Sequence, residues 1–280
     1  KRADSGEPWL YDAQWSDDIH HSMHAVMTAD PGRYYTDYLG RVDLVARALA
    51  EGAAWQGEYL EHEQRHKGQP SAFLPPSAFV AFMQNHDQVG NQPWGRRISH
   101  RLPDAALRMW SAIVLLSPQI PMIFMGEEWK ASSPFLFFSD VGEDLADTIR
   151  DSRREEFSIY PEARHGTLPD PMSAESFGGS KLVWSELDGH EHQAMLNHYK
   201  RLIDLRTRCV SPRLHGMAGH SARYAVLADR LVQVAWTLGD GAVLELTANL
   251  GPEPVDTVCI ATDDCLWLEG TAGPSGLGGW

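Results

Sequence analysis

Two short apolar runs, each followed at once by polar residues, constrain the fold more than any other feature of this sequence. The runs are Phe79–Met83 and Pro121–Met125. Between them, apolar residues at helical spacing predict a helix from about Pro103 to Ser117. Because both runs are apolar on both faces, they are typical of buried parallel strands joined by a crossover helix. The polar residues that follow each run then share the sheet edge where barrels and open α/β sheets place their active sites.

Helical periodicity predicts two further helices near the start of the chain. The first runs over residues 16–27, with Ser16 as its N-cap and Pro31-Gly32 as its stop. The second covers residues 42–49 and ends at Gly52. Residues 141–210 are also predicted to be helical, with Leu145, Ile149 and Phe157 on one face and Met195, Tyr199, Leu202 and Ile203 on another.

The pattern changes near residue 211. Arg223–Leu227, Leu231–Leu238 and Val243–Leu250 are predicted strands, and Gly239-Asp240-Gly241 is a hairpin turn between two of them. No helical segment separates these strands, so they predict a small antiparallel domain over residues 211–280. The glycine-rich end of the chain is expected to be loose.

Charge and cysteine content exclude several classes of partner. The chain has 24 Lys and Arg against 38 Asp and Glu, a net charge of −14, which argues against nucleic acid or an anionic membrane as the main partner. No apolar run approaches the roughly 20 residues of a membrane span, and no basic segment followed by an apolar one opens the chain as a signal peptide would. Three cysteines, Cys209, Cys259 and Cys265, predict reduced thiols and a cytoplasmic location.

The segment Gln84-Asn-His-Asp-Gln88 is the strongest candidate for a functional site. It clusters hydrogen-bonding groups at a predicted strand end, and the carboxylate of Asp87 is able to accept hydrogen bonds from two adjacent hydroxyls while His86 donates to the same ring. The plainer alternative is that Asn85 and Asp87 only begin a turn, with His86 as a cap.

Ten tryptophans in an acidic chain favour a sugar-binding cleft lined by aromatic platforms. Trp15, Trp94 and Trp129 lie close to predicted strand ends and are the candidates. The alternative for each is a core position with its indole N–H satisfied.

Two histidine-rich clusters are weaker candidates. His62-Glu-Gln-Arg-His66 matches the H-E-x-x-H pattern of zinc proteases, but the segment lacks an apolar face and Gly68 interrupts it, so it is interpreted as a solvated loop. In Asp17-Asp18-Ile-His-His21, the helix dipole alone explains the two carboxylates in the first turn. It does not explain the two adjacent histidines, His20 and His21, which are weak evidence for a functional site.

Taken together, the motifs resemble one family of the α-amylase clan of glycoside hydrolases, the maltooligosyltrehalose trehalohydrolases. The resemblance rests on Phe82-Met-Gln-Asn-His-Asp-Gln-Val-Gly-Asn91, Tyr11-Asp-Ala-Gln-Trp-Ser-Asp-Asp-Ile-His-His21, Trp55-Gln-Gly-Glu-Tyr59, Phe124-Met-Gly-Glu-Glu-Trp129 with Ser133-Pro-Phe135, and Lys181-Leu-Val-Trp-Ser-Glu186. These motifs occur in order from about Tyr11 to Arg206.

The resemblance implies a (β/α)₈ TIM barrel followed by a β-domain. It implies retaining hydrolysis of the α-1,4 bond next to the terminal trehalose of maltooligosyltrehalose, with no metal and no organic cofactor. Asp87 corresponds to the carboxylate that stabilises the transition state. The substrate-binding positions implied are Asp17, Asp18, Ile19, His20, His21, His86, Gln88, Val89, Gly90 and Asn91.

One departure from the family is large. The family's nucleophile Asp and acid Glu precede the Asp-Ala-Gln-Trp segment, which here begins at Asp12, and Leu10 stands where the nucleophile motif has Arg. Asp12 is therefore assigned to strand six. A barrel takes roughly 250 residues, so residues 1–210 are expected to be its C-terminal part, about strands six to eight. The chain, which begins at Lys1, is then a C-terminal fragment, inactive and prone to aggregation alone.

Two other functions stay open. The parent protein is alternatively another α-glucan-active member of the clan, such as a branching enzyme or an amylase. The chain is alternatively a non-catalytic carbohydrate-binding module that kept the rim of the barrel.

Overall fold

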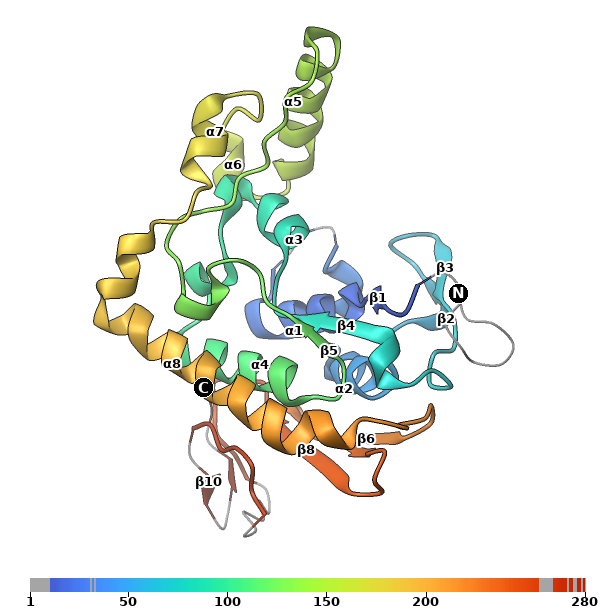
Figure 1. The fold of residues 1–280 in the computed structure, drawn as a ribbon. Coiled ribbons are helices and arrows are strands. Elements are labelled where there is room, and N and C mark those ends of the chain that lie inside the picture. Colours follow the sequence, from blue (N-terminus) through green and yellow to red (C-terminus); the bar gives the residue numbers. More distant parts are fainter. Residues whose placement is uncertain are drawn as a thin grey trace.

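The structure is a computed structural model that describes residues 11–256 except 31 and 33, together with 264–270, 272–273, 276–277 and 279 (Figure 1). The cysteines at 209 and 265 are free thiols in it, and Cys259 lies outside the described residues, as do Leu10 and most of the glycine-rich end. Within the described part of the chain, no helix is both long enough and apolar enough to cross a membrane.

Three parallel strands form the sheet that carries the candidate site. They are β1 (Gln14–Trp15), β4 (Phe79–Phe82) and β5 (Ile120–Met122), in the order β1-β4-β5. Val80 lies opposite Ile120, and both pairings of β4 are parallel. The helix α4 (Asp104–Leu116) connects β4 to β5, with Pro103 one residue before it. The predicted strand–helix–strand unit is therefore confirmed.

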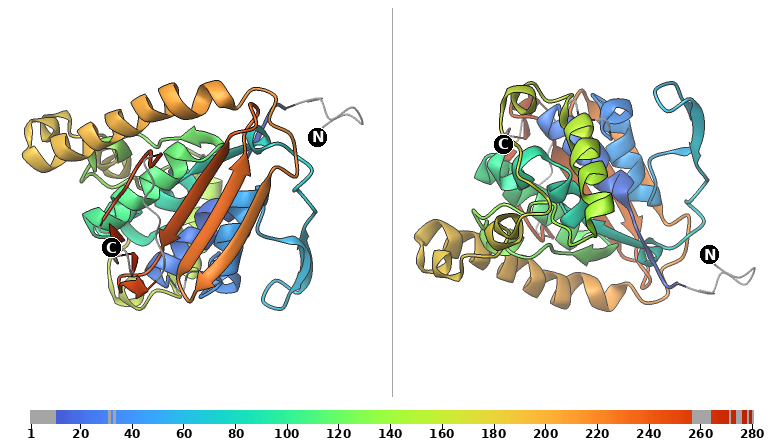
Figure 2. Two further views of the ribbon diagram at one scale, coloured as in Figure 1. Left: turned by 90° about the horizontal axis from the view of Figure 1, so that it is seen from below. Right: turned by 90° about the horizontal axis from the view of Figure 1, so that it is seen from above.

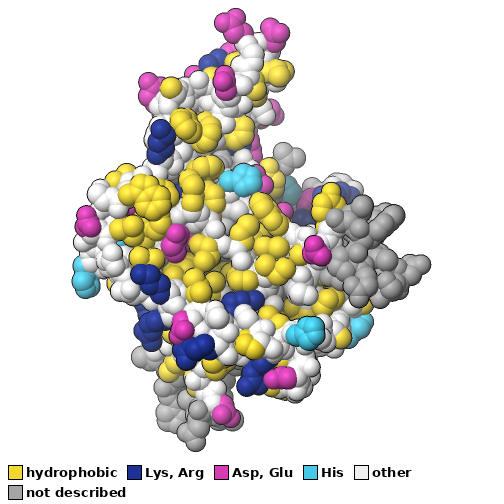
Figure 3. Space-filling view, viewed as in Figure 1, with side chains coloured by type: hydrophobic (Ala, Val, Ile, Leu, Met, Phe, Trp, Pro, Cys, Tyr) yellow, Lys and Arg dark blue, Asp and Glu magenta, His cyan; other side chains and the backbone are white. Residues whose placement is uncertain are grey.

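The expectation that both strands are buried on both faces is wrong for β5. Ile120 is 41% exposed, and Met125 beyond the strand end is also exposed, whereas β4 is almost entirely buried. The reason is position, because β4 lies between two strands while β5 is an edge strand of the three. Figure 3 shows the consequence, a broad spread of apolar side chains over the face that carries β4 and β5.

Two capped helices follow the first strand. In α1 (Asp17–Thr28), the Ser16 hydroxyl accepts from the backbone N–H of Ile19, as the N-cap prediction required. In α2 (Val42–Glu51), Gly52 ends the helix with φ 87°, a left-handed conformation that glycine adopts without strain. Asp12, assigned from the sequence to a strand, instead lies two residues before β1.

A hairpin of β2 (Gln56–Leu60) and β3 (Arg65–Gly68) joins α2 to β4. It replaces the solvated loop expected for residues 59–69. His62 lies in the turn and His66 in β3, so the two histidines do not share a helical face as the zinc motif requires.

Residues 141–210 are largely helical, as predicted, and contain α5 (Glu143–Phe157), α6 (Pro161–His165), α7 (Ala174–Gly179) and α8 (His190–Leu205). A short helix that the sequence did not predict, α3 (His86–Gly90), follows β4. In Figure 1, α5 to α7 project away from the sheet, while α8 runs along its other side. The predicted apolar faces are only partly buried, since Leu145 and Ile203 are exposed. Short 3-10 or π turns cover Thr36–Tyr38, Pro76–Ala78, Pro93–Gly95, Ile98–His100, Glu127–Trp129, Trp184–Asp188, Arg206–Val210 and Ser211–Arg213.

The predicted antiparallel strands are present near the C-terminus. They are β6 (Ala222–Ala228), β7 (Leu231–Thr237) and β8 (Val243–Asn249), and the turn between β7 and β8 contains Gly241 with φ 85°. Short strands β9 (Val255–Asp256), β10 (Ala272–Gly273) and β11 (Gly276–Leu277) form a second small sheet.

The β6–β8 sheet packs against α2 and shares one apolar core with the rest of the molecule. Figure 2 shows this sheet as a layer beneath the helices. Val232 and Trp236 of β7 belong to the same buried cluster as Val45 of α2 and Trp110 of α4. The domain boundary near residue 210 stays a prediction.

Candidate active site

The candidate site begins where β4 ends. Gln84 and Asn85 are buried there, and the side-chain oxygen of Asn85 accepts from the backbone N–H groups of Asp87 (2.8 Å) and Gln88 (3.4 Å). In return, Gln88 Oε1 accepts from the backbone N–H of Asn85 at 3.0 Å, which completes a capping box on α3. Asn85 therefore does begin a turn, as the plainer alternative held, and this turn leaves His86 and Asp87 unused as caps.

Asp87 and His86 point away from the core. Their side chains are 63% and 54% exposed, and His86 Nε2 lies 3.4 Å from Asp87 Oδ1. The ring of Trp15, at the end of β1, meets the His86 ring edge-on with centroids 5.9 Å apart, and it is also exposed. A carboxylate, an imidazole and an indole thus lie together on an open surface, a combination suited to hydroxyl-bearing rings.

Asp17 brings a second carboxylate to this surface. Gln88 Nε2 donates to Asp17 Oδ1 at 3.2 Å, which links the first turn of α1 to α3. Although Asp17 is exposed, surrounding protein atoms displace water from it, and this desolvation, followed by the negative charges of Asp87 and Asp18, raises its pKa. Asp17 and Asp87 are therefore close enough to repel each other electrostatically.

Asp18 and His20 have structural partners instead of an open face. Asp18 Oδ1 accepts from the hydroxyl of Tyr38 at 2.5 Å and Oδ2 from the backbone N–H of Ala54 at 2.7 Å, so this carboxylate does more than complement a helix dipole. The His20 ring is buried and bonds the backbone carbonyl of Met83 at 2.7 Å, and burial lowers its pKa far below the ordinary value. His20 thereby ties α1 to the end of β4.

Most of the remaining predicted substrate-binding residues are also buried or bonded to other parts of the protein. Ile19 and Val89 are buried apolar side chains. His21 is half-buried, and burial lowers its pKa to about 3. At the C-terminal end of α3, the carbonyl of Gly90 and the side-chain oxygen of Asn91 accept from the guanidinium of one α5 arginine, Arg153, at 2.5 and 2.7 Å. The structure therefore brings together Asp17, His86, Asp87 and Gln88 with Trp15, while the rest support this group from behind or beside it.

The three candidate tryptophans, Trp15, Trp94 and Trp129, lie in different environments. Trp15 lies at the site, as described. Trp129 is only 4% exposed and packs on Trp184 with ring centroids 5.1 Å apart, so its prediction as an open platform is wrong. Trp94 is half-buried, and its indole N–H donates to the carbonyl of Thr167 at 3.1 Å.

A buried polar network behind the site was not anticipated. Glu127, just past β5, accepts from the Tyr199 hydroxyl of α8 at 3.0 Å and also interacts with the side chain of Gln84. Burial raises the pKa of Glu127 to about 8. Gln84 Oε1 accepts in turn from the backbone N–H of Ile98 at 3.1 Å. Because these residues are far apart in sequence, the only sequence signal of the network was the adjacent pair Glu127 and Glu128 in the motif Phe124–Trp129.

The chain is similar to known proteins over most of its length. Residues 219–280 match the family model described as a domain of unknown function (DUF3459). A malto-oligosyltrehalose trehalohydrolase of Deinococcus radiodurans is 36% identical over 207 residues, covering 73% of this chain and 34% of that protein. One of Rhizobium sp. is 33% identical over 270 residues, covering 92% of this chain and 43% of that protein. The crystal structure of a putative alpha amylase from Salmonella typhimurium superimposes with a TM-score of 0.90 at 34% identity, covering 100% of this chain and 47% of that one.

These matches place the chain in the α-amylase family of glycoside hydrolases. Within it, the chain belongs to the malto-oligosyltrehalose trehalohydrolase family, as the motifs indicated. It spans about a third to two fifths of the length of these curated relatives.

Proposed function

We propose that this chain is part of a glycoside hydrolase that releases trehalose from malto-oligosyltrehalose by cleaving the α-1,4 bond next to the terminal trehalose. The observation that carries the proposal is the meeting of Asp87 and His86 with Asp17 and Trp15 at the ends of two parallel strands. The names of the relatives support the choice of substrate.

Asp87 has the role of stabilising the transition state. Its exposed carboxylate accepts hydrogen bonds from two neighbouring hydroxyls of one glucose ring and its negative charge opposes the positive charge that grows on the anomeric carbon. His86 donates to the same ring, and Trp15 offers an aromatic surface beside it. Asp17, with a raised pKa, accepts from a hydroxyl farther along the substrate.

The other two carboxylates of a retaining mechanism, the nucleophile and the acid, are proposed to lie outside this chain. The fraction of the relatives' length that the chain spans leaves room for them. In this scheme β1, β4 and β5 are strands six, seven and eight of a barrel, and the missing strands cover the apolar surface around Ile120. Residues 1–210 form the barrel part and residues 211–280 the β-domain of a cytoplasmic enzyme that needs no cofactor.

Trehalose release from malto-oligosyltrehalose tests the proposal. We expect no turnover from the 280-residue chain and turnover from the longer protein that its complete coding sequence specifies. In that protein, Asp87→Asn should lower kcat/KM by about 10²–10³-fold, the usual loss when one charge-stabilising group is removed. The control is Asp147→Asn, which neutralises an exposed carboxylate on α5 and should leave the rate unchanged. Near-normal activity of Asp87→Asn, or turnover by the 280-residue chain, would contradict the assignment.

An amylase-type activity is the second candidate. The structural relative named a putative alpha amylase covers the whole of this chain, which favours an unmodified α-1,4-glucan as an alternative substrate. Product analysis separates the two, because only the first activity requires a trehalose-terminated chain. Equal rates on malto-oligosaccharides with and without the trehalose end would favour the amylase.

A further inference from the structure

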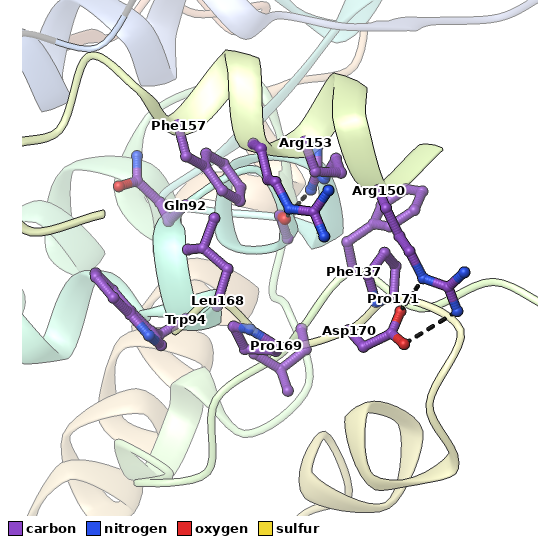
Figure 4. Close-up of a pocket in the computed structure, with 14 residues that line it drawn as sticks. Gln92, Trp94, Phe137, Arg150, Arg153, Phe157, Leu168, Pro169, Asp170 and Pro171 are labelled. Carbon is purple, nitrogen blue, oxygen red and sulfur yellow. Dashed lines mark hydrogen bonds and ion pairs between the residues drawn. The ribbon is translucent and has the colours of Figure 1, made fainter. Parts of the chain in front are cut away.

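A cavity of about 150 Å³ lies beside the candidate active site, between α5 and the turn that follows α3. Figure 4 shows its walls. Phe157 of α5 and Phe137 are aromatic, and Trp94 lies at one end beside Leu168. A space smaller than the roughly 300–1,000 Å³ of sites for drug-sized ligands admits one ring of a ligand but not several.

The backbone at Trp94, which forms one wall of the cavity, is strained. Trp94 has φ 60°, a left-handed conformation that bulky residues rarely adopt, and Gly95 follows with φ 58°. A side chain at Gly95 would lie 2.4 Å from the carbonyl oxygen of Phe135, so only glycine fits there. The hydrogen bond from Trp94 to Thr167 fixes the indole across the cavity. Strain of this kind persists where the surrounding structure over-determines a side chain.

The polar side of the cavity is an ion pair. Arg150 Nε and Nη2 donate to the two oxygens of Asp170 at 3.0 and 3.1 Å, as the dashed lines in Figure 4 mark. Arg150 Nη1 donates to Asp147 at 2.9 Å. Both members of the Arg150–Asp170 pair are partly exposed, and both line the cavity. Such a pair offers donors and acceptors side by side, which is what neighbouring hydroxyl groups require.

The other two arginines of the cavity are also charge-compensated. Arg153 Nη1 donates to Glu156 at 2.9 Å, and its guanidinium lies over the rings of Phe137 and Phe157. Arg154 Nη1 donates to an acidic partner, Asp151, at 2.6 Å. Because each arginine has a carboxylate within hydrogen-bonding distance, the cavity carries little uncompensated charge to attract an anion.

We propose that this cavity binds a neutral hexopyranose ring, with its apolar face against the aromatic walls and its hydroxyls on the Arg150–Asp170 pair. Gly90, the last residue of α3, lines the cavity, and Arg153 bonds both Gly90 and Asn91, so an occupant lies against the end of the helix that carries Asp87. That the ring is a glucosyl unit rests on the proposed function, whereas the fit of a neutral pyranose does not.

Hydroxyl-radical footprinting, read by mass spectrometry with maltose as the probe, tests this at single residues. In the complete protein, maltose should protect Phe137 and Trp94 from oxidation, while Trp184, which is more exposed and does not line the cavity, should stay reactive. Asp170→Asn should raise the maltose concentration for half-protection at least tenfold. The matched control Asp147→Asn removes the other carboxylate on Arg150 and should leave protection intact.

A second pair of variants guards against a folding defect. Phe137→Ala should abolish protection of Trp94, whereas Phe138→Ala, which truncates a similarly exposed neighbour outside the cavity, should not. Protection by inorganic phosphate but not by maltose would overturn the proposal and indicate an anion site. Equal protection of Trp184 by maltose would also overturn it, because it would indicate non-specific binding. Absence of protection by maltose would also refute it. Protection that persists while the Asp87→Asn test fails would refute the proposed function alone.

Discussion

Replacing Glu127 by Gln should remove a pH-dependent loss of stability. Glu127 is buried and bonds the side chains of Gln84 and Tyr199, and it interacts electrostatically with the carboxylate of Glu128 and the guanidinium of Arg97. Burial raises its pKa from 4.5 to about 8. As the pH rises from 4.5, the unfolded chain releases this proton before the folded chain does. The stability that the neutral carboxyl contributes is therefore complete below pH 4.5 and lost as the pH rises through 8.

The structure sets the size of this effect. The pKa of Glu127 is about 3.5 higher in the folded chain than in the unfolded chain. Because one pKa unit corresponds to 1.36 kcal/mol, this difference is worth about 5 kcal/mol at most. A glutamine at 127 does not titrate, and its side-chain oxygen still accepts from the Tyr199 hydroxyl. The variant should thus become more stable than the unsubstituted protein as the pH increases, by up to about 5 kcal/mol between pH 4.5 and pH 8.

Urea unfolding of both proteins, followed by tryptophan fluorescence at pH values from 4.5 to 9, measures the difference directly. Other titrating groups are common to both proteins and cancel. Glu191→Gln, at an exposed position of the helix that carries Tyr199, is the control and should leave the shape of the stability curve unchanged. If the free energies of unfolding of Glu127→Gln and the unsubstituted protein run parallel over this pH range, the carboxyl is already ionised in the folded state and the reasoning from burial is wrong.

Two further substitutions test the packing around the site by thermal unfolding. The buried carboxylate of Asp30 accepts from Arg101 at 2.7 Å and from His24 at 3.1 Å, so Asp30→Asn leaves the Arg101 guanidinium without its anionic partner and should cost about 3–5 kcal/mol; a loss under 1 kcal/mol would show that the pair is hydrated. Gly95→Ala combines a left-handed backbone with a clash against a backbone carbonyl and should cost more than Gly40→Ala, where φ is 69° but no atom lies within 4 Å. The second should cost about 1–2 kcal/mol from the backbone alone, and equal losses would rule out the clash.

Elements with strong local signals were predictable from the sequence. The N-cap Ser16, the C-terminal Gly52 and the hairpin turn at Gly241 have the conformations that their residue types favour. The parallel pairing of β4 and β5 followed from the length of the segment between them, since a crossover helix is the short way to connect parallel strands.

What depended on neighbours could not be predicted. The exposure of Ile120 follows from the edge position of β5, which the strand's own residues do not encode. Trp129 is buried because Trp184, 55 residues later, packs on it. The bond between Glu127 and Tyr199 joins residues 72 positions apart and has no periodic signature. At the site itself, residue types indicated Asp87 and His86 and the family resemblance implied Asp17, but only the structure shows that Gln88 joins Asp17 to α3.

Gln88 explains how that meeting is arranged. Its Oε1 accepts from the backbone N–H of Asn85 at 3.0 Å, which fixes the start of α3, and its Nε2 donates to Asp17 at 3.2 Å, which fixes the start of α1 relative to it. Asn85 meanwhile binds the backbone N–H of Asp87, so the cap is complete without the Asp87 side chain. One amide therefore holds two mutually repelling carboxylates near each other while leaving Asp87 open to solvent. An ionised glutamate at the same position would keep the cap but add a third negative charge, which is why the site requires the neutral amide of Gln88.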